Sequence, residues 1–336
     1  MSISSGALKD SYGRTIRDLR ISVTDRCQFR CFYCLPNGEP PLARKDTILT
    51  FEEILRASRV FVRLGIEKIR LTGGEPMLRR DLEKLVAGLS ELKTEGLKDI
   101  ALTTNGFSIP AKARLLKESG LDRITVSLDS LDRKNFEDIT GVDKISEVFE
   151  ALEAAKAAGL DPVKVNAVIV RGRNEHELVD FARFARDTGV SMRFIEFMPL
   201  DSGHGWKREM VVSGREIRDA IEREFPLELK KDSRGAETAW RYRFADGAPG
   251  EIGIIAPVTE MFCGQCSRIR LTADGQIRTC LFSAVEHDLR GVIRSGVSDD
   301  EIADFLRAVT LTKEASHQIN DQDFVQPERT MSFIGG

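Results

Sequence analysis

The stretch LRISVTDRCQFRCFYC, residues 19–34, places three cysteines directly behind a short run of β-type sequence. In LRISV, residues 19–23, apolar side chains alternate with polar ones, which is typical of a strand. Cys27, Cys31 and Cys34 follow with the spacing C-x3-C-x2-C and form the first cysteine set. A (β/α) barrel carries its chemistry on the loops behind its strands, so this stretch predicts both a fold and a site.

Similar β-type runs recur through the first two thirds of the chain. They cover residues 19–23, 68–72, 99–103, 123–127, 163–170 and 192–196. Amphipathic helical patterns lie between most of them, at residues 51–65, 81–92, 111–119, 145–159 and 174–189. Strands that alternate with helices predict βαβ units and a parallel sheet. Within the α/β class, this many repeats favours a partial, incomplete TIM-type (β/α)6 barrel over a flat doubly wound sheet.

The pattern changes after residue 225, which predicts a barrel over residues 1–225 and a C-terminal α+β extension over residues 226–336. The extension contains short strands, a hairpin with an Asp-Gly turn at Asp274 and Gly275, and a helix at residues 298–314. It also carries the second cysteine set, Cys263, Cys266 and Cys280, with the spacing C-x2-C-x13-C.

The composition is that of an ordinary globular protein. The chain has 336 residues, a formal net charge of −3, 41% hydrophobic and 31% charged residues, which excludes disordered and collagen-like classes. No run of 18 apolar residues occurs, and the first residues lack a signal-peptide pattern, so we expect a cytoplasmic protein with no membrane partner. The near-neutral charge argues against a nucleic-acid partner.

Two sets of three cysteines indicate metal ligation. In a reducing compartment, disulfide pairing within either set would leave one thiol unpaired. Three thiolates that hold a [4Fe-4S] cluster leave one iron open to another ligand, whereas ordinary electron-transfer clusters use four cysteines. The amino and carboxylate groups of S-adenosylmethionine can chelate such an open iron. The alternative for the first set is a structural zinc site that takes a distant fourth ligand, and the alternative for the second set is a zinc ribbon that lacks one ligand.

The first cysteine set, with Tyr33 before its last cysteine, is similar to the radical S-adenosylmethionine enzymes. Over nearly the whole chain, the sequence resembles the GTP 3′,8-cyclase family, molybdenum cofactor biosynthesis protein A. The matching segments are RDLRISVTDRCQFRC, IRLTGGEPMLRRDL, LTTNG, VSLD, VKVNAVI, RFIEFMP, the second cysteine set and the terminal Gly335-Gly336.

The resemblance implies a radical lyase with two [4Fe-4S] clusters and S-adenosylmethionine. A 5′-deoxyadenosyl radical would remove the ribose 3′ hydrogen of GTP, and C3′ would bond to C8 to give 3′,8-cyclo-7,8-dihydro-GTP. It also implies molybdenum cofactor biosynthesis protein C as the next enzyme, an electron donor such as flavodoxin or ferredoxin, and a monomer or homodimer.

The resemblance also assigns roles to individual residues. All six cysteines would bind iron, and the second cluster would hold the guanine. Tyr33, Gly74, Ser127 and Met198 would bind S-adenosylmethionine. The predicted GTP-binding residues are Arg20, Arg70, Thr103, Lys164, Arg193, Arg268, Ile269 and Arg270. Arg20, Gly335 and Gly336 are the predicted catalytic residues.

The sequence also supports this substrate physically, because a triphosphate requires several cations and the predicted GTP-binding set is rich in Arg and Lys. Two other functions stay open at this point. A radical S-adenosylmethionine peptide maturase can also carry extra C-terminal clusters, although such enzymes usually have more cysteines. A zinc-stabilised binding module without catalytic activity is the third possibility.

Overall fold

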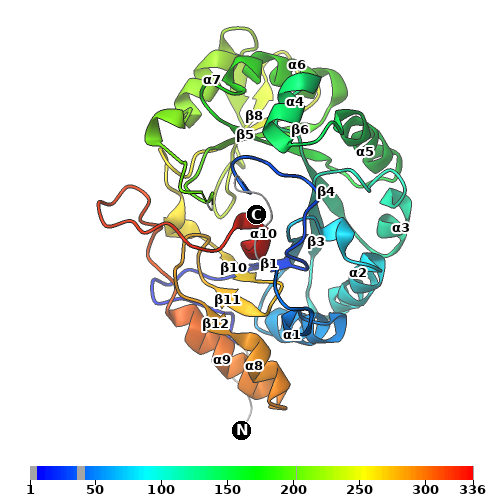
Figure 1. Cartoon of the computed structure of the whole chain (residues 1–336), viewed down its shortest axis with the longest axis vertical. Coiled ribbons are helices and arrows are strands. Elements are labelled where there is room, and N and C mark those ends of the chain that lie inside the picture. Colours follow the sequence, from blue (N-terminus) through cyan, green and yellow to red (C-terminus); the bar gives the residue numbers. More distant parts are fainter. Residues whose placement is uncertain (1–5, 36–41, 202, 336) are drawn as a thin grey trace.

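The computed structural model describes residues 6–35, 42–201 and 203–335, and its centre is one mixed sheet. The strand order is β12-β11-β10-β1-β2-β3-β4-β5-β6-β9-β8-β7. Strands β1 to β6 pair in parallel and in chain order, which confirms the predicted α/β class. Figure 1 shows the helices that connect these strands on the outside of the curved sheet.

The strands lie close to the predicted runs. Their bounds are β1 (Asp18–Ser22), β2 (Lys68–Thr72), β3 (Asp99–Thr104), β4 (Arg123–Ser127), β5 (Lys164–Ile169), β6 (Ser191–Glu196), β7 (Leu227–Leu229), β8 (Trp240–Phe244), β9 (Glu251–Ile255), β10 (Arg268–Leu271), β11 (Gln276–Arg278) and β12 (His287–Asp288). The predicted hairpin is confirmed, because β10 and β11 are antiparallel and Gly275 adopts a positive φ of 80° in the turn.

The described helices include four that the sequence patterns did not predict, namely α4, α7, α8 and α10. Their bounds are α1 (Phe51–Arg63), α2 (Leu82–Glu91), α3 (Ala113–Glu118), α4 (Arg133–Thr140), α5 (Ile145–Ala157), α6 (Leu178–Thr188), α7 (Gly214–Glu222), α8 (Leu289–Arg294), α9 (Asp299–Leu311) and α10 (Met331–Ile334). None of the described helices is both long and apolar enough to cross a bilayer.

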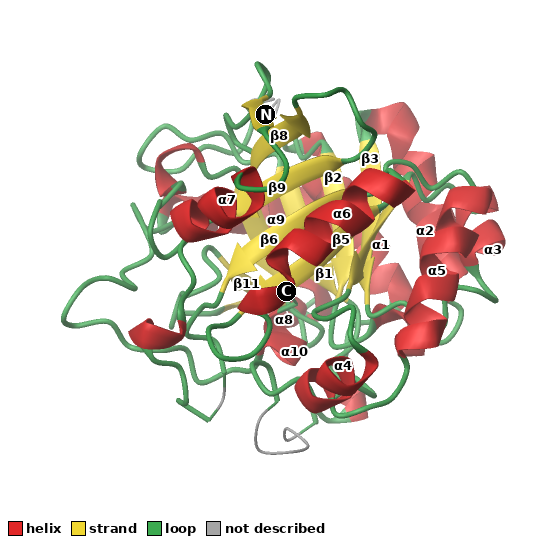
Figure 2. Cartoon of the chain, turned by 90° about the horizontal axis from the view of Figure 1, so that it is seen from above, coloured by secondary structure: helices red, strands yellow, loops and turns green. Residues whose placement is uncertain are grey.

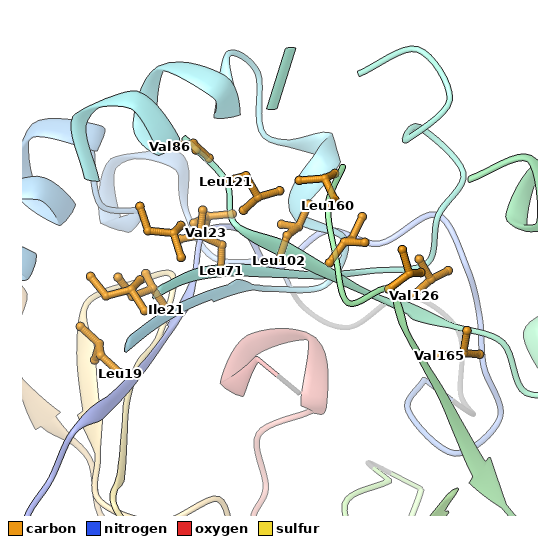
Figure 3. Close-up of a cluster of buried hydrophobic side chains, with 14 of the residues drawn as sticks. Leu19, Ile21, Val23, Leu71, Val86, Leu102, Leu121, Val126, Leu160 and Val165 are labelled. Atoms are coloured by element: carbon orange, nitrogen blue, oxygen red, sulfur yellow. The ribbon is translucent and has the colours of Figure 1, made fainter. Parts of the chain in front are cut away.

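The strand alternation separates an apolar face of the sheet from a polar one. Leu19, Leu71, Leu102 and Val126 are fully buried, and Figure 3 shows side chains of this group on one side of the sheet, with the short C-terminal helix on the other. Alternate residues of a strand point to opposite faces, so the polar residues between them line the inner face. The outer face of the sheet is therefore packed with apolar side chains, and the inner face carries polar and charged side chains.

The C-terminal third of the chain extends this sheet at both ends. Strand β10 pairs in parallel with β1, and β9 pairs in parallel with β6. Figure 2 shows the resulting layer of strands with helices packed beside it. Both cysteine sets are thereby attached to adjoining strands, β1 and β10. The proposed division at residue 225 stays a prediction.

Candidate active site

One large cavity brings the two cysteine sets together. It holds about 1920 Å³ of space free of protein atoms, counting its open mouth, and all six cysteines line it. The other predicted residues on its wall are Arg20, Tyr33, Gly74, Thr103, Ser127, Met198, Arg268 and Arg270. Residues that lie more than 200 positions apart in the sequence therefore share one cavity, because β10 pairs directly with β1.

The first cysteine loop is held in place by helix α4. The backbone N–H of Arg30 donates to the carbonyl of Thr140 at 2.8 Å, and that of Phe32 donates to Ile139 at 3.1 Å. The amide of Cys34 donates to the carbonyl of Cys31 at 2.9 Å, which turns the loop back on itself. The end of α4 therefore fixes the positions from which the three thiols project.

A second loop, behind β2, packs directly against the cysteine loop. The N–H of Gly74 donates to the carbonyl of Thr24 at 2.8 Å, and the N–H of Glu75 donates to that of Arg26 at 2.7 Å. A Cβ atom built at Gly74 would overlap the carbonyl oxygen of Arg26. Glycine is therefore required here by the close approach of two backbones.

Replacing Gly74 by alanine is expected to lower the free energy of unfolding by about 1–3 kcal/mol, the usual cost of forcing a methyl group into a filled site. A fall in the melting temperature of the apoprotein measures this cost. Gly264→Ala is the matched control, because a Cβ there meets nothing within 4 Å. Equal melting temperatures for the two variants would contradict the packing described.

Glu75 is a buried carboxyl that our sequence analysis did not select. It is 1% exposed and accepts hydrogen bonds from the Thr104 hydroxyl and the Asn105 amide, both at 2.7 Å. Burial raises its pKa to about 7 in spite of these donors. The carboxyl links the loop behind β2 to the end of β3 through these hydrogen bonds. The sequence signal that could have identified Glu75 is its position in the GGEP segment.

Asp129 is a second buried carboxyl that the analysis missed, two residues beyond Ser127. It accepts a hydrogen bond from the Tyr33 hydroxyl at 2.6 Å and another from the N–H of Val168 at 2.8 Å. Burial raises its pKa to about 6. Asp129 therefore fixes the Tyr33 ring against the ends of β4 and β5, beside the first cysteine set.

The two cysteine sets have different electrostatic surroundings. Burial raises the pKa of the Cys27 thiol to about 11 and that of Cys34 to about 12, and it raises that of Cys31 as well. Burial also acts on Cys266, but Arg268 and Lys313 outweigh it and lower the pKa of that thiol to about 7. The Arg268 guanidinium lies 3.3 Å from the Cys266 sulfur.

A band of cations crosses the inner face of the sheet. Arg20 pairs in register with Arg70 on one side and with Arg270 on the other. Burial is the main cause that lowers the pKa of Arg20 to about 10, that of Arg70 to about 9 and that of Lys164 to about 7. Neighbouring guanidinium groups add to each shift, because like charges disfavour one another.

These cations have few anionic partners in the described part of the chain. Arg70 donates to the hydroxyl groups of Thr103 and Thr125, at 3.0 and 3.1 Å, and makes no ion pair. The side chains of Arg20 and Lys164 make neither a hydrogen bond nor an ion pair with any described residue, although their backbones pair within the sheet. Buried charges without partners are costly, so this face is suited to an anionic ligand.

Besides Gly335, five predicted residues are not placed on the wall of this cavity. Arg70 lies on β2 next to Arg20 and lines neither of the two cavities. Lys164 and Arg193 line a second, smaller cavity next to Glu251, with which Arg193 forms an ion pair at 2.9 Å. Ile269 is 1% exposed and packs in the hydrophobic core. Gly336 lies outside the described residues. The structure does not test the roles assigned to these positions.

Gly335, the last described residue, lies against the inner face of the sheet, next to Ser22 and Thr72. Its carbonyl accepts a hydrogen bond from the Arg270 guanidinium, and its φ of 79° favours glycine. A Cβ atom there would overlap the Thr72 hydroxyl. Helix α10 places the tail in the middle of the curved sheet (Figure 1), next to β1.

The two cysteine sets suit a cluster with several irons better than a single ion. Among the residues that the structure describes, no three His, Cys, Asp or Glu side chains converge on one metal position. The thiolates of a cubane bind different irons at separate corners, so they need not converge. Three thiols in each set, all lining the cavity, are the donors that an iron–sulfur cluster uses.

The family models match in two consecutive segments. Residues 21–185 match the radical SAM superfamily, and residues 190–319 match the Molybdenum Cofactor Synthesis C family. A curated GTP 3′,8-cyclase of Corynebacterium glutamicum is 46% identical over 336 residues, which cover 98% of this chain and 89% of that protein. The chain belongs to the GTP 3′,8-cyclase family.

Other members of the GTP 3′,8-cyclase family match over a similar length. The protein of Mycolicibacterium smegmatis is 46% identical, with 99% of this chain and 93% of that protein covered. "GTP 3′,8-cyclase 2" of Mycobacterium tuberculosis is 44% identical, with the same coverage. Like its relatives in the radical SAM superfamily, this chain is an enzyme.

Solved structures support the fold of the family. Streptococcus suis SuiB, bound to its precursor peptide SuiA, superposes with a TM-score of 0.59 at 16% identity, covering 80% of this chain and 61% of that chain. The structure of anSMEcpe with bound AdoMet also gives 0.59 at 16% identity, covering 90% and 82%. At this identity, the likeness shows the radical SAM α/β fold alone.

Proposed function

We propose that this enzyme converts GTP to 3′,8-cyclo-7,8-dihydro-GTP in molybdenum cofactor biosynthesis. The observation that carries the proposal is that one cavity joins six cysteine thiols, in two sets of three, to the buried guanidinium groups of Arg20 and Arg270. A cofactor site alone explains neither the second cysteine set nor the cations. The family membership supplies the identity of the substrate.

Strands β1 to β6 and their helices form, in this proposal, an incomplete (β/α)6 barrel whose interior is the cavity. The C-terminal extension then closes its open side through β10 and carries the second [4Fe-4S] cluster. The parallel pairing of β10 with β1 places Cys266 and Cys280 at the amino-terminal ends of these strands, whereas the first set follows the carboxyl end of β1. The two sets would therefore lie toward opposite ends of the cavity that both of them line.

The first cysteine set would bind a [4Fe-4S] cluster with one open iron for S-adenosylmethionine. When bound, this pair supplies a 5′-deoxyadenosyl radical. The chain would orient the cofactor with Tyr33, Gly74, Ser127 and Met198, all of which line the cavity. Tyr33 is held by Asp129, so its ring is ordered before the cofactor arrives.

GTP would lie between the two sets, with its base toward the second set and its phosphates along the cation band. Arg20, Arg70 and Arg270 are placed in register on three adjacent strands, which presents guanidinium groups side by side to phosphate oxygens. Lys164, Arg193, Thr103 and Arg268 would complete the phosphate and ribose contacts. Arg20 and the Gly335-Gly336 tail would border the reacting ribose.

The reaction places the enzyme in a short sequence of steps. Its product would be consumed by molybdenum cofactor biosynthesis protein C, and its electron would come from a small donor such as flavodoxin or ferredoxin. We further propose a cytoplasmic enzyme that acts as a monomer or homodimer, without a nucleic-acid or membrane partner.

The direct test incubates the anaerobically reconstituted enzyme with GTP, S-adenosylmethionine and dithionite. We expect 5′-deoxyadenosine and a cyclised guanine nucleotide in equal amounts, both measured by liquid chromatography with mass detection. ATP in place of GTP is the control and should give no cyclised product. Cofactor cleavage that GTP neither stimulates nor couples to a nucleotide product would contradict the proposal and favour a peptide substrate.

A further inference from the structure

Lys313 is a buried cation at the second cysteine set that none of the preceding roles uses. It follows α9, is 4% exposed and lines the cavity. Its ammonium donates to the carbonyl of Arg268 at 3.0 Å and to the carbonyl of Thr279. Within the described part of the chain, no carboxylate pairs with it. A buried ammonium without a carboxylate is costly unless another negative group lies nearby.

The three thiols of the second set are that negative group once they bind iron. The two carbonyls that hold Lys313 belong to residues beside Cys266 and Cys280, so the ammonium sits between the two arms of the set. Its charge lowers the pKa of Cys263, Cys266 and Cys280 alike, although burial is the largest influence on each. Lys313 therefore acts on the whole set.

Among the described residues on the cavity wall, no lysine other than Lys313 occurs, so the first cysteine set has no equivalent ammonium there. The charged neighbours that act most on Cys31 are Asp129 and the other two thiols of the set, and all of them raise its pKa. Arg30 lowers the pKa of Cys27, where burial is the larger influence. Near the second set, Arg268 is a further cation that lowers the pKa of Cys266. At Cys280, the carboxylate of Glu314 raises the pKa and so opposes the effect of Lys313.

We propose that Lys313 is the fixed countercharge of the second iron–sulfur cluster and holds its reduction potential above that of the first. The inference rests on the proposed function, because it requires a cluster on each cysteine set. A nearby positive charge stabilises the more negative, reduced form of a cluster, and local charge is among the factors that set cluster potentials. The cluster beside the sulfonium needs a strongly reducing electron, whereas a cluster that anchors a substrate does not.

The test measures the potential of the second cluster by anaerobic potentiometry followed by EPR. The variant Cys27→Ser/Cys31→Ser/Cys34→Ser isolates the second cluster, and Lys313→Gln is introduced into both this background and the full enzyme. Glutamine loses the charge but keeps N–H donors for the two carbonyls. Lys313→Arg keeps the charge, and Lys84→Met, at an exposed position, is the surface control.

We expect Lys313→Gln to lower the second potential by about 59 mV, which is a tenfold change in the ratio of reduced to oxidised cluster. The first potential should stay unchanged, and Lys313→Arg and Lys84→Met should match the parent. If only the arginine variant retains the cluster, a positive charge is required for binding, which also supports the proposal.

An unchanged second potential in Lys313→Gln, with the cluster intact, would overturn the proposal. So would loss of the cluster in both the glutamine and arginine variants, because Lys313 would then be only a bridge between backbone segments. If the triple serine enzyme with Lys313 intact contains neither iron nor sulfide, the proposed second cluster itself is wrong. The two failures are therefore distinguishable.

Discussion

Replacing Cys31 by serine is expected to abolish 5′-deoxyadenosine formation. Cys31 lies in the middle of the first set, and its backbone carbonyl accepts hydrogen bonds from the amides of Cys34 and Leu35. Serine preserves this turn and removes only the thiolate. Changes beside a metal ligand usually cost 10–100-fold, so loss of the ligand itself should exceed about 100-fold. The measurement is 5′-deoxyadenosine released per enzyme with dithionite present.

The control for this variant is the second cysteine set. Iron and sulfide bound by that set should remain, and the melting temperature of the apoprotein should match the parent, because the backbone hydrogen bonds of the loop do not use the Cys31 sulfur. Robust 5′-deoxyadenosine formation by Cys31→Ser would show that the first set does not hold the cofactor-cleaving cluster.

Replacing Cys266 by serine is expected to separate cofactor cleavage from cyclisation. The first cysteine set and its contacts with α4 and Gly74 are untouched, so some 5′-deoxyadenosine should still form. Cyclised product should fall below detection, because the substrate base would lose its anchor at the second set. The ratio of cyclised nucleotide to 5′-deoxyadenosine, near one in the parent, should approach zero.

The matched control for Cys266→Ser is Ser267→Ala, its neighbour, whose hydroxyl donates to Asp18 and whose side chain is not on the cavity wall. That variant should keep the parental ratio. A normal yield of cyclised nucleotide from Cys266→Ser would contradict the role of the second set in holding the substrate.

The sequence predicted the repeating strands and helices well, because the signal for each lies within a few residues. The strand runs at 68–72 and 123–127 coincide with β2 and β4, and all six cysteines line the predicted kind of site. The cysteine spacing carried most of this information. Thiols that share a short loop reveal a local ligand set without any knowledge of the remaining fold.

Other features could not be predicted because they depend on contacts between distant segments. The charged sequence of α4 gives little hydrophobic pattern. Its role in holding the first cysteine loop is seen only in the structure, where the N–H of Arg30 donates to the carbonyl of Thr140. Helix α10 is a single turn of four residues. Asp129 and Glu75 look like ordinary loop acids until the structure shows that they are buried, and Lys313 looks like a solvated helix end.

The central claim is that each set of three cysteines holds one [4Fe-4S] cluster with an open iron, and that both clusters face one cavity. Its most direct test is iron and sulfide analysis of the anaerobically reconstituted enzyme. The account predicts about eight irons and eight sulfides per chain, and about four of each when either cysteine set is replaced by serine. Zinc without sulfide, or an unchanged content after the loss of one whole set, would contradict it.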